Sequence, residues 1–214
     1  MNSIATSLMQ YLRFISILIL LGSCTSEFKN LSARENVNCE VDRFQPRFQS
    51  DLYSANVDVI NKHLSGLLFI KLMPDSSIRA VFQSEMGLTY FDFEWTATGN
   101  FTARSVIKQM NKKAVITTLR RDFELLLMKG MDASMATRFS DGAFLYTKFP
   151  KENEYIYLVS DSTCSQFVRL ESASSRKVKV TMTRTMPEGS HTPDSVFIQH
   201  RNFKFTITLK RIQH

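Results

Sequence analysis

Few residues in this chain have the types and spacing that catalysis needs. Its 214 residues include four histidines, none in an HExxH pattern or near a cysteine at metal-ligand spacing, and neither a GxSxG elbow nor a phosphate-binding glycine loop occurs. Asp92 and Glu94 would share one face of a strand, as a glycosidase pair would, although alternating acids more often form a solvated face or pair with neighbouring Arg or Lys. Asp122, beside Arg120 and Arg121, favours a surface ion pair. The sequence therefore predicts no enzyme, no metal site and no cofactor.

One cysteine lies in a specific processing pattern. A basic residue and the apolar run 14–21 precede the tetrapeptide Leu-Gly-Ser-Cys at 21–24, which is the order of parts in a secretory signal. The run is too short to cross a bilayer, which takes roughly twenty apolar residues. The tetrapeptide resembles the lipobox of bacterial lipoproteins. This resemblance implies removal of a signal peptide, residues 1–23, and lipid attachment to Cys24; an ordinary secretory signal with a chance cysteine is the alternative.

The position after Cys24 and the net charge bear on location and partners. Thr25 rather than an aspartate follows the lipid-bearing position, which under the enteric sorting rule favours the outer membrane, with the chain facing the periplasm. The formal net charge of +7 would suit anionic lipid or nucleic acid. Export argues against nucleic acid, so we expect a solvated basic surface that is attracted to membrane headgroups and a membrane contact through the N-terminal lipid. A protein partner is not identified.

Two further cysteines, Cys39 and Cys164, remain for a possible disulfide. An oxidising envelope compartment permits such a bridge. It also requires a fold that brings the two Cα atoms within about 7 Å, which the sequence does not show. Bridged and free thiols therefore both stay open.

The rest of the chain reads mainly as strands. Residues 24–50 are largely polar and are predicted to be the lipidated cysteine and a tether, and residues 51–214 a single domain. Alternation and turn residues predict strands at 52–59, 67–72, 78–82, 88–95, 101–106, 143–149, 155–159, 167–170, 178–183, 196–200 and 203–209.

One segment has helical spacing instead. Apolar residues recur at three- and four-residue intervals over 115–127, with Asn111 as a candidate cap, Gly130 as a candidate stop and charged residues available to the wetter side. A shorter helical piece is predicted at 131–138. The fold class is then α+β and mostly antiparallel: a curved open sheet or half-barrel of about ten or eleven strands, with a central amphipathic helix on its concave side.

Large apolar residues are concentrated around the helix and the first strands. The chain has 17 phenylalanines and ten methionines but one tryptophan. As a set, these residues suggest an apolar ligand cavity between helix and sheet, although any one of them could simply fill a core. The residues predicted to line the cavity are Phe69, Phe82, Phe91, Phe93, Trp95, Leu119 and Phe123.

The lipobox, the antiparallel strands and the helix together resemble the LolA/LolB lipoprotein-sorting family over most of residues 51–210. That family forms an open half-barrel closed by helices around a cavity for acyl chains. The resemblance implies a non-enzymatic carrier or acceptor of lipid or lipoprotein acyl chains, and a loop at Leu72 and Met73 that contacts membrane or acyl chains. Residues 65–71, 85–88 and 91–94 also look like uncharacterised outer-membrane lipoproteins of Bacteroidetes. The alternative is a structural or adaptor lipoprotein that has a filled core and binds a protein partner.

Overall fold

A computed structural model describes residues 26–34, 37, 39–59 and 62–212. Cys24 and the predicted signal peptide lie outside these residues. In the described part, no helix has the length and apolar character needed to cross a bilayer.

Thirteen strands of the described residues form one sheet in which every neighbouring pair is antiparallel. The strands are β1 (Ser32–Ala33), β2 (Ser50–Val59), β3 (Lys62–Leu72), β4 (Ile78–Gln83), β5 (Thr89–Trp95), β6 (Phe101–Val106), β7 (Thr137–Ser140), β8 (Phe144–Lys151), β9 (Glu154–Asp161), β10 (Phe167–Ala173), β11 (Val178–Thr185), β12 (Ser195–His200) and β13 (Phe205–Arg211). The predicted antiparallel class is confirmed, with more strands than the ten or eleven expected.

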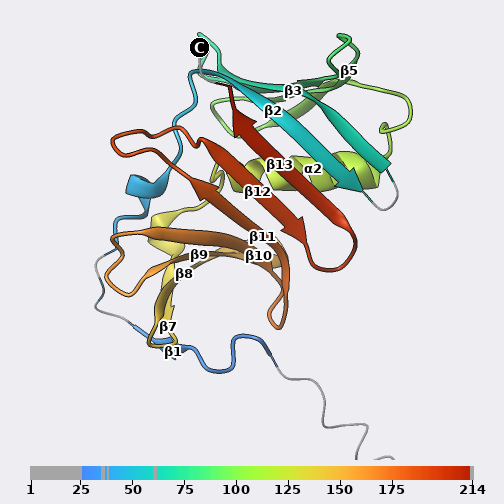
Figure 1. Cartoon of the computed structure of the whole chain (residues 1–214). Coiled ribbons are helices and arrows are strands. Elements are labelled where there is room, and N and C mark those ends of the chain that lie inside the picture. Colours follow the sequence, from blue (N-terminus) through green and yellow to red (C-terminus); the bar gives the residue numbers. More distant parts are fainter. Residues whose placement is uncertain (1–25, 35–36, 38, 60–61, 213–214) are drawn as a thin grey trace, which may run out of the picture.

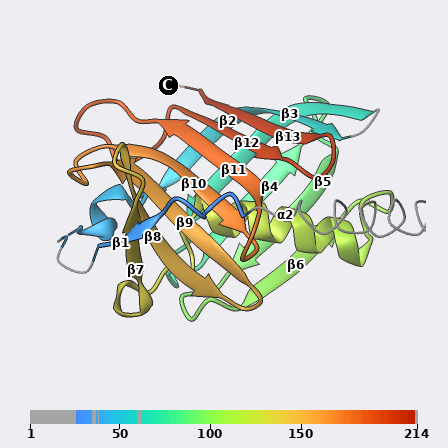
Figure 2. The same ribbon diagram turned by 90° about the horizontal axis from the view of Figure 1, so that it is seen from below.

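The strand order makes the sheet open. It runs β1-β7-β8-β9-β10-β11-β12-β13-β2-β3-β4-β5-β6, so β1 and β6 form the two edges. The pairing of β13 with β2 joins the C-terminal strand to the first long strand. The sheet curves strongly, and in the view from below the helix lies within its curve (Figures 1 and 2).

The helix that fills this curve is α2 (Lys113–Leu126), close to the predicted 115–127. Its N-cap is Lys112, one residue after the predicted Asn111, and no side chain caps it. Gly130 follows in the left-handed conformation, with φ of 75°, which glycine adopts without steric cost. Leu119, Phe123 and Leu126 recur on the face of α2 that packs against the main core.

The segment predicted as a tether needs correction, because its described residues pack against the domain. Phe28 stacks on Tyr157 with ring centroids 4.4 Å apart and helps to cover a second apolar cluster on the outer face of the sheet. β1 pairs with β7, and a 3-10 helix, η1 (Val41–Phe44), buries both its end residues. The driving force is apolar burial by hydrophobic residues interspersed among the polar ones.

The shorter helical piece predicted at 131–138 is also corrected. Only Ala133–Met135 is helical, as the 3-10 helix η2, and the chain then becomes strand β7. β7 pairs with β8 on one side and with β1 on the other, so long-range pairing overrides local preference.

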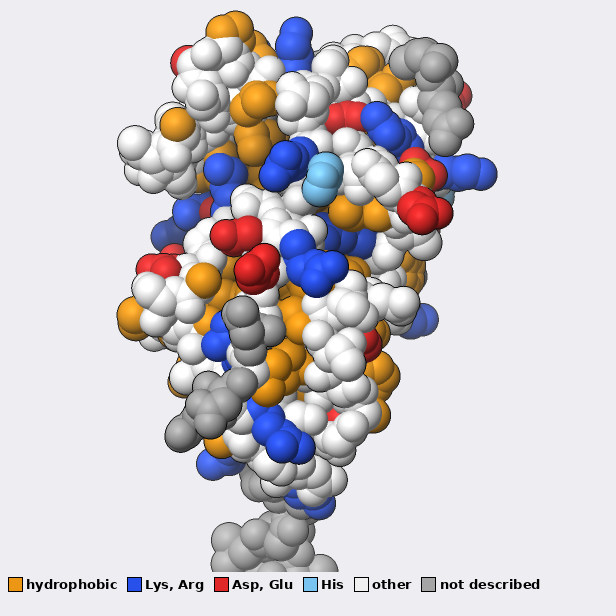
Figure 3. Space-filling model, turned by 90° about the vertical axis from the view of Figure 1, so that its left-hand side faces the viewer, with side chains coloured by type: hydrophobic (Ala, Val, Ile, Leu, Met, Phe, Trp, Pro, Cys, Tyr) orange, Lys and Arg blue, Asp and Glu red, His pale blue; other side chains and the backbone are white. Residues whose placement is uncertain are grey.

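On the face drawn in Figure 3, basic and acidic side chains mix in the upper half, and the charged side chains of the lower end are mainly Lys and Arg.

Candidate functional site

The space between α2 and the sheet is lined by aromatic side chains, as predicted, but it is filled. Phe91 and Phe93 stack with ring centroids 4.4 Å apart, and Phe123 of α2 packs edge-on against Phe91 at 5.5 Å and tilted against Trp95 at 6.1 Å. Every one of these side chains is at most 4% exposed. The structure therefore shows a continuous aromatic core under the helix, where the sequence suggested a cavity.

Phe82 and Leu119 join this core, whereas Phe69 does not. Phe82 packs against Phe91 at 5.7 Å, and Leu119 is buried in the same cluster. Phe69 lies on the outer face of β3 and is 42% exposed, because Leu68 and Ile70 point inward. The prediction that Phe69 lines the cavity was therefore wrong. Phe69 lies in a run of consecutive apolar residues, and such a run has no alternation from which the inner face could be assigned.

Trp95 brings an unsatisfied polar atom into the aromatic core. Its side chain is fully buried, and its Nε1 atom has no hydrogen-bond acceptor within the described part of the chain. A buried donor left unpaired costs about 1–3 kcal/mol. A ligand or water oxygen reaching this position would remove that cost.

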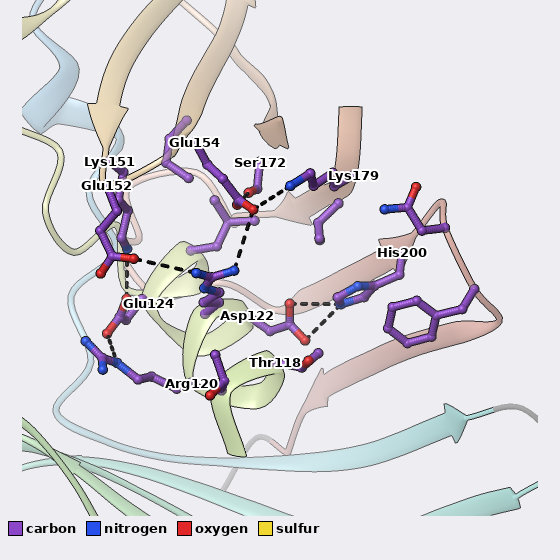
Figure 4. A pocket seen from close by; sticks show the side chains of 17 residues that line it. Thr118, Arg120, Asp122, Glu124, Lys151, Glu152, Glu154, Ser172, Lys179 and His200 are labelled. Carbon is purple, nitrogen blue, oxygen red and sulfur yellow. Dashed lines mark hydrogen bonds and ion pairs between the residues drawn. The ribbon is translucent and has the colours of Figure 1, made fainter. Parts of the chain in front are cut away.

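A polar cleft of about 290 Å³ lies on the other side of α2. The helix forms one wall, and strands β8 to β12 with the β12–β13 turn form the other (Figure 4). About half of the lining residues are charged, and each wall contributes both cations and anions. The side chains that carry its interactions are those of Arg120, Arg121, Asp122, Glu124, Lys151, Glu152, Glu154, Lys179 and His200.

The most buried interaction in the cleft joins Asp122 of α2 to His200 at the end of β12. The His200 Nε2 atom lies 2.9 Å from one carboxylate oxygen of Asp122 and 3.0 Å from the other, and the two side chains point toward each other (Figure 4). Burial raises the pKa of Asp122, and the hydrogen bond with His200 opposes this shift. The prediction of a surface ion pair for Asp122 was wrong, because its partner comes from a strand 78 residues further on.

Glu124 forms a second link across the cleft. Its carboxylate accepts a hydrogen bond of 2.8 Å from the Lys151 Nζ of β8 and one of 2.7 Å from Arg120 on its own helix. Burial by itself would raise the pKa of Glu124, but these two cations outweigh it and hold the pKa below its usual value. Glu124 is therefore a buried anion with two basic partners, and not a free base.

A third link starts from Arg121. Its guanidinium lies 3.5 Å from carboxylate oxygens of both Glu152 and Glu154. Glu154 also accepts a hydrogen bond of 2.6 Å from Lys179. Three successive charged positions of α2 thus connect it to the opposite wall, and every carboxylate named here has a basic partner. Ion pairs and hydrogen bonds across the cleft hold the polar face of α2, and packing against the aromatic core holds its apolar face.

The remaining candidate acids form ion pairs on the outer face of the sheet. Asp92 accepts hydrogen bonds from Arg79, with the Arg79 Nε atom at 2.9 Å, and Glu94 pairs with Arg104. The hydrogen bond from Arg104 lowers the pKa of Glu94. The expected pairing with neighbouring arginines is therefore present, whereas a solvated face is not, because Asp92 is only 8% exposed. Within the described residues, no group of three or more His, Cys, Asp or Glu side chains is placed to hold a metal.

The predicted loop and cysteines occupy separate places. Leu72 ends β3 and is partly exposed, and Met73 starts the β3–β4 turn at the same end of the strand. Cys39 and Cys164 form a disulfide with their Cα atoms 5.6 Å apart, which ties the segment before η1 to the β9–β10 turn. Cys24 lies outside the described residues.

No protein-family model and no curated protein matches the sequence. Three solved structures have similar folds. A LolA superfamily protein from Nitrosomonas europaea is 7% identical, with a TM-score of 0.49 over 81% of this chain and 88% of that one. A DUF1329 family protein from Desulfovibrio piger is 9% identical, with a TM-score of 0.44 over 81% and 87%. A chain from Vibrio parahaemolyticus, described as an outer membrane lipoprotein-sorting protein domain, is 5% identical, with a TM-score of 0.44 over 80% and 87%.

Two of these descriptions name the group that the sequence resembles. The architecture expected from that resemblance, an open antiparallel sheet around a helix, is the one described above. At these identities and TM-scores the likeness assigns no function, which has to be argued from the residues of this chain.

Proposed function

We propose that this chain is a lipid-anchored protein of the bacterial envelope that takes up acyl chains of lipids or lipoproteins between α2 and the sheet, without catalysing a reaction. The observation that carries the proposal is the two-sided environment of α2. One face of the helix rests on aromatic side chains, and the other is fastened across a polar cleft by ion pairs and hydrogen bonds. In this proposal, an acyl chain enters by replacing the aromatic contacts on the apolar face of α2, while the polar links keep the helix attached.

Acyl chains suit this place in both shape and chemistry. An acyl chain entering beside Phe123 exchanges aromatic contacts for methylene contacts, and each buried methylene is worth about 0.8 kcal/mol. The unpaired indole N–H of Trp95 then finds an acceptor if an ester or carboxyl oxygen follows the chain inward. The polar links at the rim need only shift with the helix, because most of them end on long, flexible Lys and Arg side chains.

The single tryptophan provides a direct test. Trp95 is fully buried under the helix, so a brominated fatty acid such as 9,10-dibromostearate quenches its emission only by entering the core. The proposal expects saturable quenching by dibromostearate and none by aqueous iodide. A matched control carries Trp95→Phe with Phe69→Trp, which moves the only indole to the outer face. Quenching of the control but not of Trp95 would overturn uptake between helix and sheet.

A second candidate function, an adaptor that binds a protein partner, is favoured by the filled core. Phe69 is exposed, and its outer-face neighbours across β2 and β4 are Leu52 and Val81, both half-buried. This strip could be covered by another protein. Native mass spectrometry after extraction from the envelope distinguishes the two functions, because a carrier retains stoichiometric lipid and an adaptor retains a second polypeptide.

The anchoring part of the proposal rests on the tetrapeptide at 21–24 and concerns Cys24, outer-membrane location and a periplasmic orientation. Growth with radiolabelled palmitate should label the wild-type chain and not a Cys24→Ser variant. Membrane fractionation then locates the labelled protein. Equal labelling of the two chains, or none of either, would overturn lipid attachment at Cys24.

A further inference from the structure

The first described residues lie against one rim of the sheet. The backbone N–H of Glu27 donates to the carbonyl of Arg176 at 2.9 Å, and the Glu27 carboxylate lies 3.2 Å from the Arg201 guanidinium. Arg176 belongs to the β10–β11 turn, residues 174–177, and Arg201 to the β12–β13 turn, residues 201–204. The start of the described chain is therefore fixed beside both turns.

Covalent geometry limits how far Cys24 lies from this rim. Three residues of fully extended chain span at most about 11 Å, so Cys24 lies within that distance of Glu27. A lipid on Cys24 places this cysteine at the level of the bilayer headgroups. The two turns then come within roughly one to two Debye lengths of the headgroups at physiological salt.

The two turns carry the side chains that an anionic bilayer attracts. Arg176 and Lys177 are exposed on the first turn, and Arg201 and Lys204 on the second. Phe203, between the last two, is 44% exposed and packs loosely against Phe205 at 5.9 Å. Basic side chains for headgroup phosphates and an aromatic side chain for the interfacial layer form the usual pairing at a membrane surface.

Nearby acids offset part of this charge and leave Arg176, Lys177 and Lys204 without an acidic partner among the described residues. Glu27 is already paired with Arg201, and Asp58, across the neighbouring strand, is bonded to His63 at 2.7 Å. A hollow of about 440 Å³ lined by Asp58 and residues 199–206 surrounds the β12–β13 turn and leaves its basic side chains accessible.

We propose that the β10–β11 and β12–β13 turns form a docking rim that rests on an anionic phospholipid bilayer through Arg176, Lys177, Arg201, Phe203 and Lys204. The orientation of this rim toward the membrane rests on the proposed anchoring at Cys24; the attraction to anionic lipid does not. The docked chain holds the Leu72–Met73 turn away from the membrane. That turn lies at the opposite end of β3, about 33 Å along the strand at about 3.3 Å per residue.

The first test uses the mature-length chain with Cys24→Ser, so that binding depends on the rim alone. Co-sedimentation with vesicles of phosphatidylglycerol and phosphatidylcholine compares this chain with a variant carrying Arg176→Gln, Lys177→Gln and Lys204→Gln. Each basic residue near an anionic surface strengthens binding roughly fivefold, so the triple variant should bind roughly a hundredfold more weakly. Arg201 is left unchanged because it also pairs with Glu27.

The matched control removes the same charge from the opposite rim. Arg47, Lys71 and Lys210 are exposed there, and their triple replacement by Gln should leave vesicle binding within about twofold of the parent, because charges at that distance from the bilayer are screened. Equal weakening in the two triple variants would overturn the docking rim, because binding would then follow net charge alone. Absence of binding by the parent chain to anionic vesicles would overturn it as well.

A second test uses the lipidated chain, in which Cys24 is retained, and measures how the chain is oriented on the membrane. With Trp95→Phe and Phe203→Trp, the single indole should be quenched by brominated phospholipid in the anchored state, whereas Phe69→Trp in the same background should not. No quenching at position 203 would overturn the docking rim. Missing palmitate on Cys24, with rim-dependent vesicle binding intact, would instead refute the anchoring part of the proposed function and leave the rim standing as a lipid-binding surface.

Discussion

Replacing Phe123 by alanine removes the side chain through which α2 reaches the aromatic residues of the sheet. Phe123 is 4% exposed, and its ring lies 5.5 Å from Phe91 and 6.1 Å from Trp95. Lost transfer free energy and the remaining cavity together cost about 3–5 kcal/mol for a buried phenylalanine. We therefore expect the free energy of unfolding to fall by about 4 kcal/mol, and the denaturation temperature by roughly 8–16 °C for a chain of this size.

Urea unfolding followed by the emission of Trp95 measures this loss, because the only tryptophan lies in the same core. Phe69→Ala is the matched control: the same side chain is removed where it is 42% exposed, and the expected loss is about 1 kcal/mol. A loss at Phe123 no greater than that of the control would refute the reasoning. The polar cleft alone would then be holding the helix.

The cavity in Phe123→Ala also probes the proposed ligand. A ligand that binds only the folded chain stabilises it by about 2.7 kcal/mol when present at a hundred times its dissociation constant. Decanoate should therefore restore a large part of the stability lost in Phe123→Ala and leave Phe69→Ala nearly unchanged. Equal shifts in the two variants would contradict acyl binding in the core.

Three further changes test other parts of the structure. Gly66→Ala should lower the denaturation temperature measured by circular dichroism, because its Cβ would lie 1.9 Å from a carbonyl oxygen of β4; an unchanged temperature would place that strand elsewhere. Cys39→Ser should lower the free energy of unfolding by about 3–5 kcal/mol through loss of the bridge to Cys164, and reductant should then have no further effect. Burial raises the pKa of Asp122 above 3.8, so the folded chain binds this proton more tightly than the unfolded chain does. The protonated carboxyl therefore stabilises the fold at low pH. This contribution is lost as the pH rises from the pKa of the unfolded chain through that of the folded chain. Asp122→Asn should flatten that part of the curve of urea midpoint against pH, and an unaltered slope would show that the link to His200 fully compensates burial.

Local patterns in the sequence predicted the elements that are long and regular. The helical spacing over 115–127 located α2 to within two residues at each end, and turn residues separated most of the strands. The two strands that were missed, β1 and β7, are two and four residues long. Segments so short carry no readable alternation, and they are strands only because each finds a partner remote in sequence.

The candidate site was predicted only in part for the same reason. The alternation of Phe91, Phe93 and Trp95 placed them correctly on the inner face, because the acids between them fix the other face. Asp122 looked like a surface residue because only its helix neighbours were visible, whereas its burial depends on His200 arriving from β12. Whether a core of aromatic residues is filled or hollow depends on the curvature of the sheet, which no local pattern encodes.

The disulfide between Cys39 and Cys164 determines how an anchored chain responds to tension. A pull between membrane and domain acts first on the few contacts of residues 26–34, the short β1–β7 pairing and the stacking of Phe28. Once these contacts separate, the segment from Cys24 to Cys39 can extend to at most about 50 Å. The disulfide then passes part of the load directly to the β9–β10 turn. The N-terminal segment can thus extend under tension until the disulfide limits its length.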